Sequence, residues 1–155
     1  MEYNSFIIAR ALHIVAVVMW IGGVAFVTTV LIPSIRNSKS LENKLNLFEL
    51  LESKFGLQAK LTTLVTGISG FYMLYVLNAW HTMHWWIHLM IFIWAIFSLI
   101  LFVFEPLFLH KWFHQKAQLN NEKAFFFLQL MHTILLSISL IAVFCGVVGA
   151  HGFFY

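Results

Sequence analysis

The chain carries near its beginning the stretch FIIARALHIVAVVMWIGGVAFVTTVLI, residues 6–32. Arg10 is the one charged residue in this stretch, and Pro33 follows directly after it. A helix needs about 20 predominantly apolar residues to cross the hydrocarbon core of a bilayer. Because the stretch is longer than that and stops at a proline, which disrupts helices, we expect a membrane-spanning helix over residues 6–32.

Three further apolar runs, 57–77, 82–109 and 124–150, are also long enough to cross a bilayer. Of the 155 residues, 61% are hydrophobic and 10% are charged, and the mean hydropathy is +0.88. A soluble domain of this size needs more polar surface. The sequence therefore predicts an all-α integral membrane protein, a single domain over residues 1–155 folded as a four-helix up-down-up-down bundle. We find no hydrolase, phosphate-loop or nucleic-acid-binding pattern and expect no nucleic-acid partner.

Positive charge is concentrated on one side of the expected bundle. Eight of the nine Lys and Arg residues lie in or beside the connections 34–56 and 110–123. Because cytoplasmic loops carry such an excess, we expect these two loops in the cytoplasm and both termini in the periplasm of a bacterial inner membrane. Apolar residues recur at helical spacing among charged ones over about 40–55, which predicts an amphipathic helix on the inner membrane surface.

The expected spans contain two histidines at matching depths. Counted from Phe6 and Thr82 at 1.5 Å per residue, His13 lies about 10 Å and His88 about 9 Å along its helix. Helices diagonal to each other in such a bundle are roughly 11–14 Å apart, which suits a flat macrocycle between two imidazoles. Because haem iron commonly takes histidine ligands, the pair predicts one haem b. The alternative is that each histidine only hydrogen-bonds across the bundle.

Two further residues of the first span fit the same prediction. Arg10 precedes His13 by three residues, on the same helical face and one turn nearer the outer surface. A guanidinium there suits the propionates of a haem, although Arg10 can equally extend to the lipid headgroups. Trp20 follows on the same side of the helix, and we expect it to pack against the macrocycle.

A copper site is the competing interpretation of the third span. His81, His84 and His88 follow at i, i+3 and i+7, which places them on one face of the third expected helix, from the outer surface inward. Met83 and Met90 lie nearby, and imidazole and thioether ligands suit Cu(I). The simpler alternative is that these histidines are solvated at the outer interface.

Three more polar residues lie inside the expected spans. Glu105 follows His88 by 17 residues and returns to nearly the same face, and Lys60 lies at a similar depth on the second span. We expect these two to form an ion pair, with a proton relay as the alternative. Pro106 predicts a kink there. His132, on the fourth span, has no facing histidine, and we expect it near that ion pair, on a polar path for protons or quinone.

The first span also resembles a known group of membrane proteins. Residues 10–23, RALHIVAVVMWIGG, resemble the opening helix of the HemJ-type protoporphyrinogen oxidases and of the broader group that includes the CopD-type copper-resistance proteins. Trp86-Ile-His88 is similar to the start of the third HemJ-type helix. The resemblance implies a four-helix inner-membrane bundle that binds haem b, with His13 as a ligand. Met90 stands where the HemJ-type proteins have a lysine, and their Asn-Glu-x-Pro element has no counterpart here.

The hypothesis that follows is a small b-type cytochrome of the inner membrane, an oxidoreductase or electron-transfer protein. It would pass electrons between a membrane donor such as quinol and an acceptor at the outer face. Its expected partners are the lipid bilayer, a quinone, a redox protein and a second copy of the chain. The alternatives are a copper-handling protein of the CopD type and a HemJ-like porphyrinogen oxidase.

Overall fold

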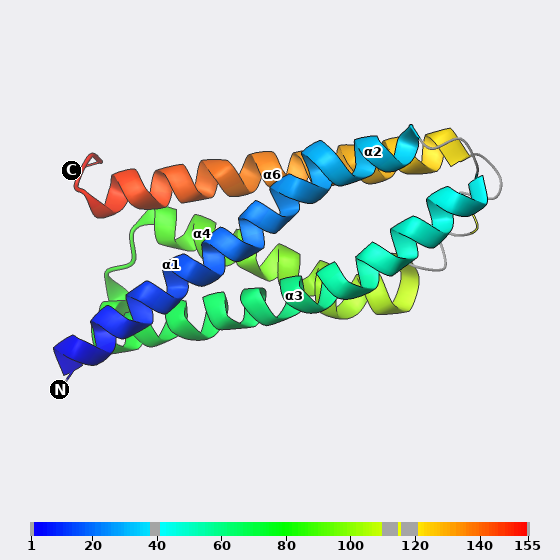
Figure 1. Cartoon of the computed structure of the whole chain (residues 1–155). Helices are drawn as coiled ribbons and strands as arrows, with labels where there is room; N and C mark the ends of the chain where they lie inside the picture. Colours follow the sequence, from blue (N-terminus) through cyan, green and yellow to red (C-terminus); the bar gives the residue numbers. More distant parts are fainter. Residues whose placement is uncertain (1, 38–40, 110–114, 116–120, 155) are drawn as a thin grey trace.

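The fold comes from a computed structural model that describes residues 2–37, 41–109, 115 and 121–154. Within these residues all regular secondary structure is helical, so the predicted all-α class is confirmed (Figure 1). The elements are α1 (Glu2–Phe26), the π-helix η1 (Val27–Leu31), α2 (Ile32–Arg36), α3 (Leu41–Val76), the 3₁₀-helix η2 (Ala79–His81), α4 (Trp85–Leu99), the π-helix η3 (Ile100–Leu109) and α6 (Asn121–Ala150).

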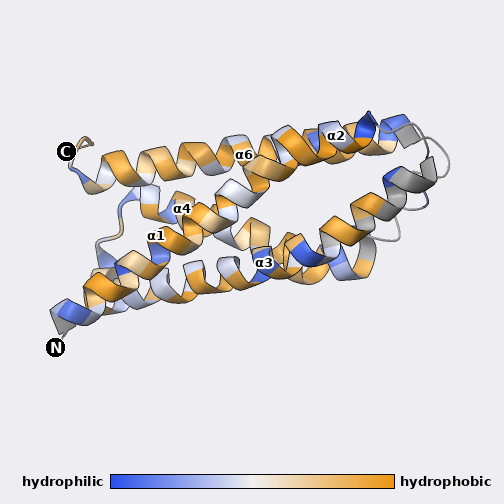
Figure 2. Cartoon of the chain, viewed as in Figure 1, coloured by the Kyte–Doolittle hydropathy of each residue, from blue (hydrophilic) through white to orange (hydrophobic). Residues whose placement is uncertain are grey.

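Three of the helical segments are long and apolar enough to cross a membrane: Tyr3–Arg36, Trp85–Leu107 and Glu122–Ala150. Their outward faces are apolar as well, because the side chains of Phe92 and Phe144 are 63% and 66% exposed. In water these surfaces would be costly, and a lipid bilayer solvates them. Figure 2 shows the same apolar character along α1, α4 and α6, with a paler, more polar stretch along α3.

Helix α3 is longer than the expected second span. We expected an interfacial helix over about 40–55 and a separate span over 57–77, but Leu41–Val76 is one unbroken helix of 36 residues. Gly56, the weakest helix former at the expected break, is buried within it. The other expected connection falls mostly on residues 110–114 and 116–120, which lie outside the described part of the chain.

The helices pack in two connected pairs. Helix α1 packs along α3, and its continuation through η1 and α2 reaches α6, so this first segment crosses from one side of the molecule to the other (Figure 1). Helix α4 packs against α6 and, to a smaller extent, α3. Helices α3 and α4 are joined by a short turn in which Asn78 adopts a left-handed conformation, with φ of 48°. The chain therefore reverses its direction between α3 and α4 (Figure 1).

Two prolines coincide with the two π-helical segments. Pro33 follows η1 by two residues, and Pro106 lies inside η3. A proline lacks the N–H that an α-helix needs and its ring clashes with the carbonyl four residues earlier. Wider π-helical turns occur where that regular pattern is interrupted. The disruption expected at Pro106 therefore takes the form of a ten-residue π-helix that contains Glu105.

Candidate functional site

His13 is held by the backbone of the neighbouring helix. Its Nδ1 lies 2.9 Å from the carbonyl oxygen of Thr66 and 3.2 Å from Oγ of Ser69, both on α3. A carbonyl can only accept, so Nδ1 carries the proton, and in the neutral ring the lone pair is then on Nε2. The ring lies over Gly70, where an added Cβ would come within 3.1 Å of Cε1. Nε2 makes no hydrogen bond within the described residues, and it is therefore the ring atom open to a ligand.

His88 lies on the outward face of α4. Trp86, Ile93 and Phe97 are the buried residues of this helix. At 100° per residue, His88 is about 180° around the helix from Phe97, and its side chain is exposed. The structure therefore does not bring His13 and His88 together: one ring points toward α3 and the other lies opposite the buried face of α4.

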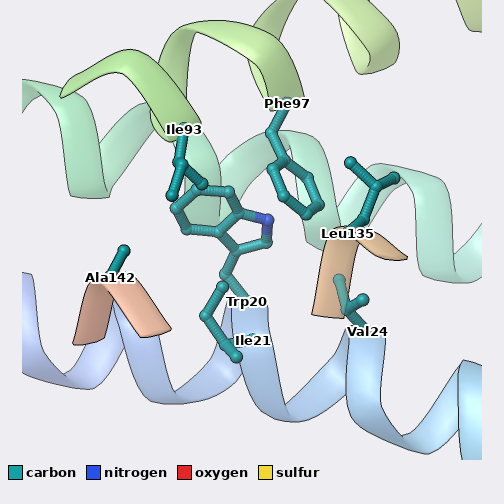
Figure 3. Packing of buried hydrophobic residues seen from close by; sticks show 7 residues of the cluster. All are labelled: Trp20, Ile21, Val24, Ile93, Phe97, Leu135 and Ala142. Atoms are coloured by element: carbon teal, nitrogen blue, oxygen red, sulfur yellow. The ribbon is translucent and has the colours of Figure 1, made fainter. Parts of the chain in front are cut away.

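Arg10 and Trp20 lie in different environments. Arg10 is exposed, one turn from His13 toward the beginning of α1. Trp20 is only 4% exposed and belongs to the central hydrophobic cluster, where its ring meets Phe97 edge-on with the centroids 4.8 Å apart (Figure 3). Its Nε1 is buried without a hydrogen-bond partner in the described structure. Trp20 is thus a packing residue that also presents an unpaired donor to the interior.

The histidines and methionine of the copper interpretation do not share a helical face. The helix α4 begins at Trp85, so His81 lies in η2 and His84 immediately precedes the helix. The ring of His84 stacks on Trp86 at a centroid distance of 4.3 Å, whereas His81 is exposed and Met83 half-buried. The expected i, i+3, i+7 alignment is therefore wrong. In the residues described, no three His, Cys, Asp or Glu side chains gather in a way that could hold a metal ion.

The expected ion pair is present. Nζ of Lys60 on α3 lies 3.1 Å from Oε1 of Glu105 in η3, and the two side chains are 29% and 22% exposed. The second carboxylate oxygen, Oε2, is buried and has no partner in the part of the chain described. His132 does not join this pair as expected, because its Nδ1 donates to the carbonyl of Leu128 on its own helix at 2.9 Å.

Two polar residues between these groups were not singled out from the sequence. The hydroxyls of Thr63 on α3 and Ser98 on α4 are buried and unpaired in the described structure. The signal for Thr63 was present, because Lys60, Thr63 and Thr66 recur every three residues along one side of α3. Ser98 stands alone in an apolar run and carries no such signal.

Comparison of the chain with models of known families, with curated proteins and with solved structures gives no match in any of the three. What the site can do therefore follows from its own residues. They are a neutral imidazole with one fixed nitrogen, a partly buried ion pair, and buried donors and hydroxyls between them.

Proposed function

We propose that this protein is a small haem b-binding redox protein of a bacterial inner membrane, in which His13 would be a ligand of the haem iron. In this proposal α3 also crosses the membrane, as the second of four spans in an up-down-up-down bundle. Both termini are periplasmic, and the connections 34–56 and 110–123 are cytoplasmic. The excess of Lys and Arg in those connections supports this orientation.

The observation that carries the proposal is the hydrogen bond between His13 Nδ1 and the Thr66 carbonyl, 2.9 Å long. Histidines that bind metals almost always donate their other ring N–H to a carbonyl, a carboxylate or water, which fixes the tautomer and orients the ring. Because Gly70 has no side chain, the imidazole can lie against α3 in this orientation. The resemblance of residues 10–23 to the HemJ-type and CopD-type opening helix supports the same ligand.

The part of His88 in the proposal depends on the packing of α4. His88 faces outward, so ligation by both histidines of one chain requires α4 to turn about its axis when the cofactor is bound. Ligation by His13 alone requires no such turn. The two cases differ spectroscopically, because six-coordinate haem gives sharp α and β bands when reduced and five-coordinate haem does not.

The remaining residues have supporting tasks in this proposal. A bound haem supplies one-electron redox chemistry. Arg10, one turn outside His13, binds a propionate carboxylate, since a guanidinium pairs with a carboxylate through two hydrogen bonds. Trp20 and Phe97 pack edge-on in the hydrophobic cluster on the inner side of the site. The electron donor is a membrane quinol and the acceptor a protein at the periplasmic face.

The proposal is tested by the absorbance spectra of the purified protein and of single variants. His13→Ala is expected to lose the Soret band or shift it strongly. His88→Ala loses the sharp reduced bands if both histidines are ligands and leaves the spectrum unchanged if His13 acts alone. The matched control is His132→Ala, a membrane histidine bonded to its own helix, which should keep the spectrum. An unchanged spectrum in His13→Ala contradicts the proposal. A colourless protein that retains copper favours the CopD-like alternative, and turnover of a porphyrinogen the HemJ-like one.

A further inference from the structure

Two buried hydroxyls in the described helices depart from the general pattern. Serine and threonine hydroxyls in apolar helices usually donate to the carbonyl one turn earlier. Thr62, Thr66 and Ser139 do so, with distances of 2.9, 2.8 and 2.7 Å. Thr63 is 0% exposed and Ser98 is half-buried, and neither hydroxyl has a partner in the described structure. Each hydroxyl is therefore available to something other than its own backbone.

These hydroxyls lie at the interface between α3 and α4. Trp94 fixes the register of this interface, because its Nε1 donates to the Thr63 carbonyl at 2.9 Å and its ring covers Gly67. The Lys60–Glu105 pair fixes the next level, about one turn closer to the beginning of α3. Thr63 therefore lies at this interface, between the level of Trp94 and the level of Glu105.

Ser98 and Trp20 approach the same stretch from α4 and α1. Ser98 follows Trp94 by one turn and lies on the same side of α4. The Trp20 ring meets Phe97, the residue before Ser98, and Figure 3 shows the indole nitrogen beside the Phe97 ring, on the side of Leu135. Thr63, Ser98 and Trp20 thus carry unpaired polar groups on three helices, close in the chain to the contacts that Trp94 and Phe97 make.

An unpaired buried polar group costs about 1–3 kcal/mol, and nearly all such groups in folded proteins have a protein or water partner. Four of them, counting Oε2 of Glu105, occur in this part of the described structure, on α1, α3, α4 and η3. Buried water typically makes two to four hydrogen bonds to groups of this kind. We propose that the α3–α4 interface is a hydrated inlet, which admits water and small monovalent cations from the Lys60–Glu105 pair to Trp20. It does not depend on a haem.

The inlet is tested by the reactivity of a cysteine at Ser98. The chain has one cysteine, Cys145, so Cys145→Ala provides a thiol-free background. In membranes carrying Ser98→Cys in that background, Ag⁺ is added and the remaining thiol is measured by intact mass after labelling in denaturant. The matched control is Leu99→Cys. Leu99 lies at the same depth in the helix, but its side chain is 52% exposed on the side of the bundle that faces lipid. Because only thiolate reacts and lipid suppresses its formation, we expect blocking at Ser98→Cys to be at least about ten times faster. Equal rates overturn the inlet.

A second measurement tests the same inlet without a thiol. If Thr63 binds water, Thr63→Val breaks a hydrogen-bonded chain and lowers the melting temperature by several degrees. If the Thr63 hydroxyl lies in a dry interior, the substitution removes an unpaired polar group and raises the melting temperature, which overturns the inlet. The matched control is the neighbouring Thr62→Val, whose hydroxyl bonds to its own helix and whose melting temperature should stay within about 1–2 °C of the parent.

Discussion

The Lys60–Glu105 ion pair makes a quantitative prediction. At 3.1 Å and an effective dielectric constant near 20, the attraction of two unit charges is about 5 kcal/mol before desolvation is subtracted. Removing one partner of a fully buried pair costs about 3–5 kcal/mol, mainly because the other charge is left alone. Since these side chains are 29% and 22% exposed, we expect a loss of about 2–3 kcal/mol for Glu105→Gln and for Lys60→Met.

The assay is a double-mutant cycle on the free energy of unfolding, measured in one detergent. Each single variant should melt about 4–12 °C below the parent protein. The double variant Lys60→Met/Glu105→Gln should be more stable than the sum of the single losses predicts, by at least about 1 kcal/mol. Lys54→Met, which removes an exposed charge from the same helix, should change stability by less than about 0.5 kcal/mol. Strict additivity of the two losses would refute a direct interaction.

Substitutions at Gly67, Asn78 and Phe125 test the packing by thermal unfolding, with Gly22 as a control position. Gly67→Ala should destabilise the protein by about 1–3 kcal/mol, because the added Cβ would come within 2.5 Å of the Trp94 ring. Gly22→Ala is the control, because a Cβ there has open space and should leave stability unchanged. Equal effects of the two substitutions would contradict the α3–α4 contact. Asn78→Gly should be tolerated and Asn78→Ala should cost about 1 kcal/mol, because the residue is left-handed; the reverse order would contradict that turn. Phe125→Ala, at a side chain 1% exposed, should cost about 3–5 kcal/mol, and a loss below 1 kcal/mol would place Phe125 outside the core.

Much of the helical content was predictable from sequence because it depends on local pattern. The apolar runs indicate where helices lie. The helical face of Glu105 and the similar depth of Lys60 in its span predicted an ion pair between the two, which is confirmed. The extent of α3 was not predictable in the same way. Polar and apolar residues alternate over 41–56 at helical spacing. Whether that helix joins the next depends on contacts such as the close approach of Glu105 to Gly56, where an added Cβ would lie 3.3 Å from Oε1 of Glu105.

The orientation of α4 was beyond the sequence for a physical reason. This helix is apolar on nearly every side, so hydrophobic periodicity does not distinguish its buried face from its outward face. The depth of His88 could be counted, but its direction depends on Trp86, Ile93 and Phe97 being the residues that pack inward. The alignment of His81 and His84 failed for a different reason, because the chain makes a 3₁₀ turn there and α4 begins only at Trp85.

The haem content of the wild-type protein tests the central proposal most directly. The measurement is the pyridine haemochrome spectrum of protein purified in mild detergent from cells supplied with haem precursors, divided by the protein concentration. We expect the spectrum of haem b at about one haem per chain. Protein that is folded and helical but carries no haem under these conditions would contradict the assignment of His13 as an iron ligand.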